Sequence, residues 1–316
     1  MTSPSLEACS LTKRFGAFRA LDHLDLKLVG AKCVGFLGPN GAGKTTMLKL
    51  LTDMIFPTEG ECYLNGISVQ RERKQALADV GVLIESPEIY PSLTPRQALE
   101  MVADLRGIPP QEAKVRIPEV LAEVRMEDWA DKRVGKFSKG MKQRINIATA
   151  LVHDPEVIVL DEPATGLDPR GMAEVRGIVR GLRKRNRLIF MSSHILQEVT
   201  DVCDEVALID KGKLLFYDTL ASVTSRFGDG HTTLDARLAR PADPDLTVKR
   251  AGALSGVRSC VVMEPTRLRL NFEGPPAERE RLLRDLIGLE IGLVSLAASE
   301  DALEEIYLRQ ISRGDL

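Results

Sequence analysis

The segment Gly38–Thr45 constrains the fold of this chain more than any other part of its sequence. It reads Gly-Pro-Asn-Gly-Ala-Gly-Lys-Thr and fits the pattern G-x-x-x-x-G-K-[ST], whose glycines allow backbone N–H groups to turn inward onto a polyphosphate. The apolar run 33–37 favours a strand before the loop, and the apolar spacing in 47–51 favours a helix after it. Strand, loop and helix in this order predict an α/β fold that binds a nucleotide.

The same loop predicts roles for single residues. A helix that begins at the end of the loop places partial positive charge beneath the phosphates. We expect Lys44 to reach the β- and γ-phosphates and the Thr45 hydroxyl to hold Mg²⁺. The residues expected to contact the nucleotide are Gly38, Pro39, Asn40, Gly41, Ala42, Gly43, Lys44, Thr45 and Thr46.

A second motif joins an apolar run to two acids. The run Val157–Leu160 is followed directly by Asp161 and Glu162. This order predicts a buried strand that ends with Asp161 near Mg²⁺ and with Glu162 placed to polarise an attacking water. The plainer alternative is a strand that ends in two solvated acids. Because a phosphate-binding loop precedes the motif, we favour the catalytic interpretation.

Length and composition limit the remaining possibilities. A chain of 316 residues exceeds the size of one usual core, so two domains are expected. The net charge of -2 gives no electrostatic reason to expect a nucleic acid partner. The 5 cysteines are scattered and are expected to be reduced. The sequence opens without a signal-peptide pattern, and its most apolar long window, 286–298, is short for a membrane span. We therefore expect a chain that does not cross a membrane by itself.

Strand and helix patterns alternate over residues 1–226 and predict an α/β domain. Within it, the stretch of about 95–152 shows helical periodicity and is expected to form a helical insert. Gly212 precedes a short run, 213–217, that favours a hairpin. The expected strands are Val34–Leu37, Val80–Glu85, Val157–Leu160, Leu188–Met191 and Val206–Ile209.

Residues 227–316 differ in composition and predict a small α+β accessory domain. A glycine-rich joint at 228–230 opens the segment, and several prolines interrupt it. The elements expected are strands near 232–238, 257–263, 267–272 and 291–297, helices near 246–253 and 277–289, and a terminal helix from 301 to 311. The first six form the order β-α-β-β-α-β, which is typical of a ferredoxin-like split βαβ unit.

From Asp161 to Asp168 the chain reads Asp-Glu-Pro-Ala-Thr-Gly-Leu-Asp, and Ser193-His194 follows a later strand. With these motifs the chain resembles the ATP-binding subunit of an ABC transporter over about residues 6–226. The resemblance implies that ATP is the nucleotide and that His194 contacts its γ-phosphate and orients Glu162. It also implies that Asp168 lies at the nucleotide and that Phe15 stacks on adenine, with Phe18 as the competing candidate.

The segment 137–141 reads Phe-Ser-Lys-Gly-Met, where the family usually carries L-S-G-G-Q. Ser138 is a good N-cap for the helical run after it, so its hydroxyl and the Gly140 N–H should form an anion site that includes Met141. Lys139 adds a positive charge there or is simply solvated. The family geometry implies that two copies face head to tail, each supplying this segment to the ATP of the other.

Glu85 departs from the family pattern, which carries a glutamine at this position. A carboxylate can still hold Mg²⁺, and its added charge is expected to raise the pKa of Glu85 or of Glu162. Glutamate here resembles the bacitracin-resistance and lantibiotic-immunity branch, whose next segment is similar to 86–94. A slowed ATPase is the alternative explanation.

The resemblance as a whole implies an ATPase subunit that powers an exporter of a drug, peptide antibiotic or lipid-like substrate. Its partners would be a second copy of itself, or a homologous ATPase, and integral membrane permease subunits, with no nucleic acid. Its place would be peripheral, on the cytoplasmic side of the cell membrane. The alternatives are an importer ATPase with a C-terminal ligand-sensing domain and a soluble ABC ATPase outside transport.

Overall fold

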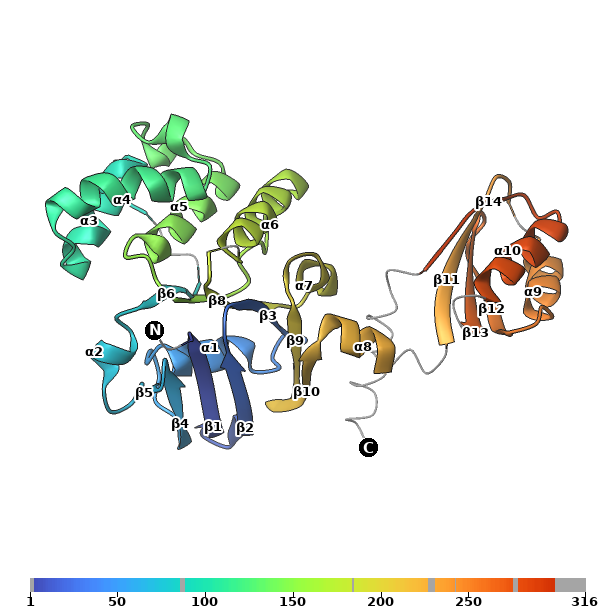
Figure 1. Ribbon diagram of the computed structural model, residues 1–316, viewed down its shortest axis with the longest axis horizontal. Helices are drawn as coiled ribbons and strands as arrows, with labels where there is room; N and C mark the ends of the chain where they lie inside the picture. Colours follow the sequence, from blue (N-terminus) through green and yellow to red (C-terminus); the bar gives the residue numbers. More distant parts are fainter. Residues whose placement is uncertain are drawn as a thin grey trace. The chain divides into compact units, whose positions relative to one another are not determined.

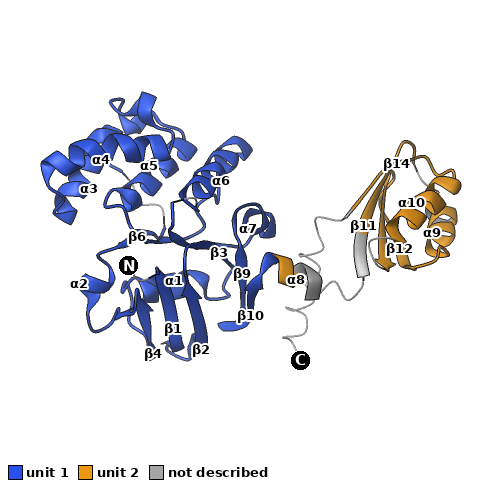
Figure 2. Cartoon of the chain, viewed as in Figure 1, with its two compact units in different colours: residues 1–220 blue, residues 221–316 orange. Residues whose placement is uncertain are grey.

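The computed structural model describes residues 3–85, 89–183, 185–226, 231–241, 243–274 and 278–298. The chain divides into two compact units, residues 1–220 and 221–316 (Figure 2). This division lies near the domain boundary expected at 226. Four expected features lie outside the described residues: the segment after Glu85 at 86–88, the joint at 228–230, the prolines at 275 and 276, and the terminal helix at 301–311.

The first unit is built on a six-stranded sheet in which five strands run parallel (Figure 1). Strands β7 and β8 are buried along their whole length, as continuous apolar runs predict. The hairpin expected after Gly212 is present, because β10 pairs antiparallel with β9. All five predicted strands are present, although the one expected over 80–85 ends at Leu83. In sheet order the six strands are β10 (Lys213–Thr219), β9 (Glu205–Asp210), β3 (Lys32–Leu37), β8 (Leu188–Ser193), β7 (Val157–Leu160) and β6 (Val80–Leu83).

A second, antiparallel sheet packs in the same unit and was not predicted from the sequence. Its order is β2 (Phe18–Val29), β1 (Ser5–Phe15), β4 (Glu59–Leu64) and β5 (Ile67–Ser68). Buried residues of both sheets and of helix α1 (Lys44–Leu51) form one continuous core. The short helix α2 (Arg73–Ala76) follows β5. The helix after the phosphate loop is therefore held between two sheets.

The stretch expected to be a helical insert is helical. It holds α3 (Pro95–Arg106), α4 (Pro110–Glu123), two short 3₁₀ turns (Glu127–Trp129 and Val134–Lys136) and α5 (Lys139–Leu151). A capping box fixes the start of α3, since Thr94 and Gln97 each accept from the backbone of the other. The remaining helices of this unit are α6 (Pro169–Arg183) and α7 (Leu196–Val202), and α8 (Leu220–Arg226) begins at its end.

The second unit contains the predicted order of elements. It comprises β11 (His231–Leu238), α9 (Pro244–Gly252), β12 (Val257–Glu264), β13 (Arg267–Glu273), α10 (Arg279–Gly288) and β14 (Leu293–Ala298). The sheet order is β12-β13-β11-β14, and every neighbouring pair is antiparallel. Strand β13 thus lies between β11 and β12, the two strands that α9 connects, and this makes a split βαβ unit. It has a core of its own.

The parallel register of the first unit sets where its loops meet. Leu37, at the end of β3, is the register partner of Ser193 on β8, and Leu160 on β7 is the partner of Met191. The carboxyl ends of these strands therefore share one edge of the sheet, the usual place for a ligand in such folds. The phosphate loop, the acid pair and Ser193-His194 all leave from that edge.

Candidate active site

Two glycines of the phosphate loop are required by close backbone contacts. A Cβ added to Gly38 would lie 2.4 Å from the carbonyl oxygen of Ile209. Gly43 has a φ of 108°, and a Cβ there would lie 2.6 Å from the carbonyl oxygen of Ala20. A side chain at either place would push the loop away from β9 or β2. The glycines thus seat the loop on its neighbours as well as freeing its N–H groups.

Lys44 is folded back into its own loop. Its ammonium group donates to the carbonyl oxygens of Gly38 at 2.8 Å and of Pro39 at 3.1 Å. It also lies 3.4 Å from Oε1 of Glu162. The side chain is only 5% exposed, so these three oxygens replace water around a buried charge. The next residue, Thr45, begins helix α1 together with Lys44, as predicted.

Glu162 receives contacts from three different segments. Its Oε2 accepts from the Thr165 hydroxyl at 3.0 Å and lies 3.0 Å from Nδ1 of His194. Partial burial raises the pKa of Glu162, but the Thr165 hydrogen bond and the charges of His194 and Lys44 outweigh burial and leave that pKa below its ordinary value. The carboxylate is therefore ionised at neutral pH, and Nδ1 of His194 donates to it.

Ser192 links the two acids at the end of β7. Its hydroxyl donates to Oδ1 of Asp161 at 2.6 Å and accepts from the backbone N–H of Glu162 at 2.9 Å. Glu162 has a φ of 43°, so a hydrogen bond to its backbone helps to hold an uncommon conformation. The sequence interpretation missed both Ser192 and Thr165. The available signal was that Ser192 directly follows the apolar run Leu188–Met191 and precedes the pair Ser193-His194.

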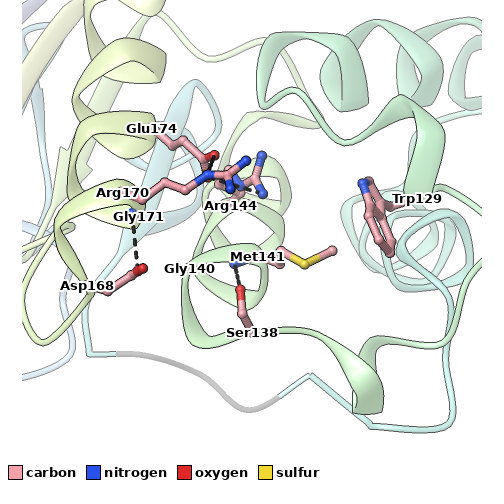
Figure 3. Close-up of a pocket in the computed structure, with 9 residues that line it drawn as sticks. All are labelled: Trp129, Ser138, Gly140, Met141, Arg144, Asp168, Arg170, Gly171 and Glu174. Carbon is pink, nitrogen blue, oxygen red and sulfur yellow. Dashed lines mark hydrogen bonds and ion pairs between the residues drawn. The ribbon is translucent and has the colours of Figure 1, made fainter.

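A second cluster of predicted residues lines a cavity of about 410 Å³ (Figure 3). Ser138 caps helix α5 as predicted, because its Oγ accepts from the N–H of Met141 at 3.2 Å. Asp168 does the same before α6, where its Oδ1 accepts from the N–H of Gly171 at 3.2 Å. The start of α5 therefore faces the start of α6. The lining residues are Trp129, Ser138, Gly140, Met141, Arg144, Asp168, Arg170, Gly171 and Glu174.

The two helix starts approach each other at their glycines. A Cβ added to Gly140 would lie 3.4 Å from Cα of Gly171. Arg144 and Glu174, one turn further along each helix, form an ion pair at 3.4 Å. Lys139 is exposed. Two helix N-termini at one cavity favour an anion there.

The two aromatic candidates for stacking lie at the end of one hairpin. Phe15 of β1 and Phe18 of β2 are register partners, 51% and 62% exposed. The Lys13 ammonium lies 5.0 Å from the centre of the Phe15 ring. Both rings are free of the core, so the choice between them stays open.

Glu85 lies just after β6 and forms an ion pair with Lys49 on α1, the helix that follows the phosphate loop. Lys49 of α1 donates to its Oε1 at 2.6 Å, and the Glu85 side chain is 72% exposed. Its φ is 60°. The rise in pKa expected from a neighbouring acid does not occur at Glu162, whose pKa is lowered by the Thr165 hydrogen bond and by the charges of His194 and Lys44. The role of Glu85 at the metal stays a prediction.

Comparisons with known proteins agree with this geometry. A family profile described as "ABC transporter" matches residues 21–165. The bacitracin transport ATP-binding protein BcrA of Bacillus licheniformis is 43% identical over 214 residues, 67% of this chain and 69% of that protein. The linearmycin resistance ATP-binding protein LnrL of Bacillus subtilis is 30% identical over 312 residues, 98% of each chain.

Solved structures show the same fold. The ATP-binding subunit of an ABC transporter has a TM-score of 0.63 at 28% identity, covering 71% of this chain and 93% of that one. The ATP-binding cassette MJ0796, described as dimeric and bound to ADP and Pi after hydrolysis, has a TM-score of 0.60 at 23% identity, covering 68% and 98%.

A mostly parallel sheet with a glycine-rich phosphate loop and an acid pair at the same edge, on strands that flank β8, defines a P-loop nucleoside triphosphatase. This chain belongs to the ABC transporter ATP-binding proteins. It is the ATP-hydrolysing subunit of a transporter, with relatives in antibiotic resistance. Among the described residues, none of the helices is long and apolar enough to span a membrane.

Proposed function

We propose that this chain hydrolyses ATP with Glu162 as the general base and that the reaction powers export of a drug, peptide antibiotic or lipid-like substrate. The observation that carries the chemistry is the convergence of Lys44, His194 and Thr165 on one ionised carboxylate. A base must be deprotonated and held in one orientation to take a proton from water. The lowered pKa of Glu162 and its contacts supply both conditions.

Lys44 changes partners in this proposal. Without nucleotide its charge is satisfied by the Gly38 and Pro39 carbonyls and by Glu162. The phosphates of ATP offer stronger acceptors at the same loop, since hydrogen bonds between ions exceed those to neutral carbonyls. Movement of Lys44 to the phosphates would leave Glu162 with Thr165 and His194. The loop residues 38–46 other than Pro39 would bind the phosphates through their backbone N–H groups.

The metal of the proposed site is Mg²⁺. Within the described ranges no group of three or more His, Cys, Asp or Glu side chains could hold a metal ion. Mg²⁺ does not need such a group, because it keeps waters and binds one or two protein oxygens together with substrate phosphates. Asp161 and Thr45 suit this mode, and so would Glu85, whose Oε1 is paired with Lys49. When bound, the ion would offset phosphate charge.

The start of α5 and Asp168 would act on the nucleotide of a second copy. Ser138, Gly140 and Met141 make a capped helix start that favours an anion. In a head-to-tail dimer this start would meet the γ-phosphate held by the other copy's loop, and an isologous twofold interface would contain two ATP. The ATP-binding cassette MJ0796, which has the same fold, is described as dimeric.

The transport role rests on the relatives. Their names associate them with bacitracin transport and linearmycin resistance, and Glu85 is the residue that resembles the bacitracin-resistance branch. We propose that the chain docks on integral membrane permease subunits at the cytoplasmic face of the cell membrane. Phe15 or Phe18 would stack on adenine.

Complementation between two inactive variants tests the composite site. We expect Lys44→Ala to weaken ATP binding to the monomer and Ser138→Arg to leave that binding intact, while each abolishes hydrolysis. Mixing the two lets a heterodimer form that contains one complete site, so ATPase activity should return in part. Gly181→Ala in α6, where an added Cβ meets nothing within 4 Å, serves as a matched surface control. No recovery in the mixture, or equal loss of monomer binding in both variants, contradicts the proposal.

A further inference from the structure

We propose that Glu198 is a positioning residue that fixes the ring of His194 through the hydroxyl of Ser193. Neither the sequence motifs nor the site described above includes Glu198. The geometric part of the inference stands alone, whereas its effect on turnover rests on the proposed function of His194 and Glu162.

The turn around His194 is held by one hydroxyl. Oγ of Ser193 accepts from the N–H of Ile195 at 2.9 Å, which closes a short turn with His194 at its centre. The same hydroxyl has one proton to donate, and two acceptors lie within reach: Oε2 of Glu198 at 2.7 Å and the Ile195 carbonyl at 3.1 Å. The shorter contact, to the Glu198 oxygen, is preferred. Glu198 thereby fixes the rotamer of Ser193 and, with it, the turn.

The buried carboxyl group of Glu198 lowers the stability of the fold, which favours a functional reason for its presence. Glu198 is 3% exposed, and its Oε1 has no hydrogen-bond partner among the described residues. A buried polar group with an unsatisfied atom destabilises a fold relative to an apolar side chain of the same volume. The Ser193 hydroxyl is its one polar anchor in the part of the chain that the structure describes. A side chain present only for packing would be better replaced by methionine.

Helix α7, which contains Glu198, packs closely on strand β3. An added Cβ on Gly35 of β3 would lie 2.4 Å from Cγ1 of Val199, so α7 packs directly on the strand that leads into the phosphate loop. Glu198 precedes Val199 and therefore has little room to shift. Because the helix is fixed on the strand, the chain Glu198–Ser193–His194–Glu162 connects a fixed point to the proposed base. Its last link is the 3.0 Å contact from Nδ1 of His194.

Imidazole tautomers report the position of the ring without any turnover. While Nδ1 donates to the ionised Glu162, His194 should hold the Nδ1–H form. The chain has 4 histidines, so ¹⁵N spectra of the parent protein and of His194→Ala identify the His194 signal. We expect Ser193→Ala and Glu198→Met to lose the Nδ1–H signature. Glu198→Gln keeps an oxygen that accepts from Ser193 and should retain it.

Kinetics provide the second readout on the same full-length variants. We expect Glu198→Met to lower kcat at least about tenfold with KM for ATP within about twofold, the pattern of a lost transition-state interaction. Glu198→Gln should stay within about threefold of the parent. Asp201→Asn is the matched control: it makes the same carboxylate-to-amide change on α7, but Asp201 contacts Arg176 at 2.7 Å.

The outcomes separate this inference from the proposed function. An unchanged His194 signature in Ser193→Ala and Glu198→Met overturns the positioning role, whatever the rates are. Equal losses in Glu198→Gln and Glu198→Met would assign Glu198 a charge effect on the helix instead, and would also overturn it. Parental turnover in Glu162→Gln and His194→Ala would refute the proposed chemistry, while the spectra would still decide the geometry. If Glu198→Met does not fold, Ser193→Ala alone carries both readouts.

Discussion

Replacement of Glu162 by glutamine is the most direct test of the proposed base. The change removes one charge and keeps the volume, so the Thr165 hydroxyl can still donate to the amide oxygen. Lys44, however, loses the ionic partner that lies 3.4 Å from its ammonium group. We therefore expect ATP to bind as tightly as before or more tightly, because the phosphates no longer compete with Glu162 for Lys44.

Loss of a positioned general base lowers the rate by roughly 10²–10⁴-fold. This corresponds to about 2.7–5.4 kcal/mol in the activation free energy, at 1.36 kcal/mol for each tenfold change. The assay is steady-state ATP turnover together with size-exclusion chromatography in ATP and Mg²⁺. Binding without hydrolysis should accumulate a nucleotide-bound dimer. Glu156→Gln is the matched control, because Glu156 is exposed and directly precedes β7, at its other end.

The pH dependence of stability gives an independent check on the same residue. The pKa of Glu162 is lower in the folded chain than its ordinary value, which is about 4.3 for glutamate. Its contribution to stability is therefore complete above that value and is lost as the pH falls through the lowered folded pKa. The stability difference between the parent and Glu162→Gln should shrink as the pH falls below about 4. Parental turnover in Glu162→Gln, or a difference that grows as the pH falls below about 4, refutes the reasoning.

Two further predictions concern charged side chains away from the base. Glu85→Gln should keep most ATP turnover but impair transport when it is assayed with the permease in lipid, since an amide oxygen can still contact Mg²⁺; faster turnover with unimpaired transport would instead show that the glutamate slows the enzyme. Arg187→Met should destabilise the chain by about 3 kcal/mol in urea, because Arg187 and its partner Glu123 are each only 4% exposed. Arg185→Met, which removes a 51% exposed contact to the same Glu123, should cost less than about 1 kcal/mol, and equal losses would contradict this account.

The central sheet could be predicted from the sequence because its strands are buried on both faces and appear as continuous apolar runs. The antiparallel sheet could not be predicted as readily. Strand β1 changes register between Ala8 and Leu11 and again before Arg14, so the regular alternation of buried and exposed positions is interrupted. Strand β2 does alternate, with Leu24, Leu26 and Leu28 buried and their neighbours more exposed. That signal was available in the sequence and was not used.

The phosphate loop, the two acids and the capping role of Ser138 were predicted because each follows from local order along the chain. The contacts of Glu162 were only partly predictable. Lys44, Ser192 and His194 are distant from it in sequence, and only the parallel register brings their strand ends to one edge. Motifs identify which residue types are present, but the sheet decides which of them touch.

The same contacts explain why Glu162 can be both restrained and available. Four groups surround it, and one of them, Lys44, would move from its Oε1 to the phosphates when ATP arrives. Ser192 holds the backbone of Glu162, and Thr165 and His194 hold its Oε2, so departure of Lys44 frees Oε1 without releasing the side chain. Under the proposed function, nucleotide binding would thus expose the oxygen that takes the proton, and a base at this position needs no larger movement to become active.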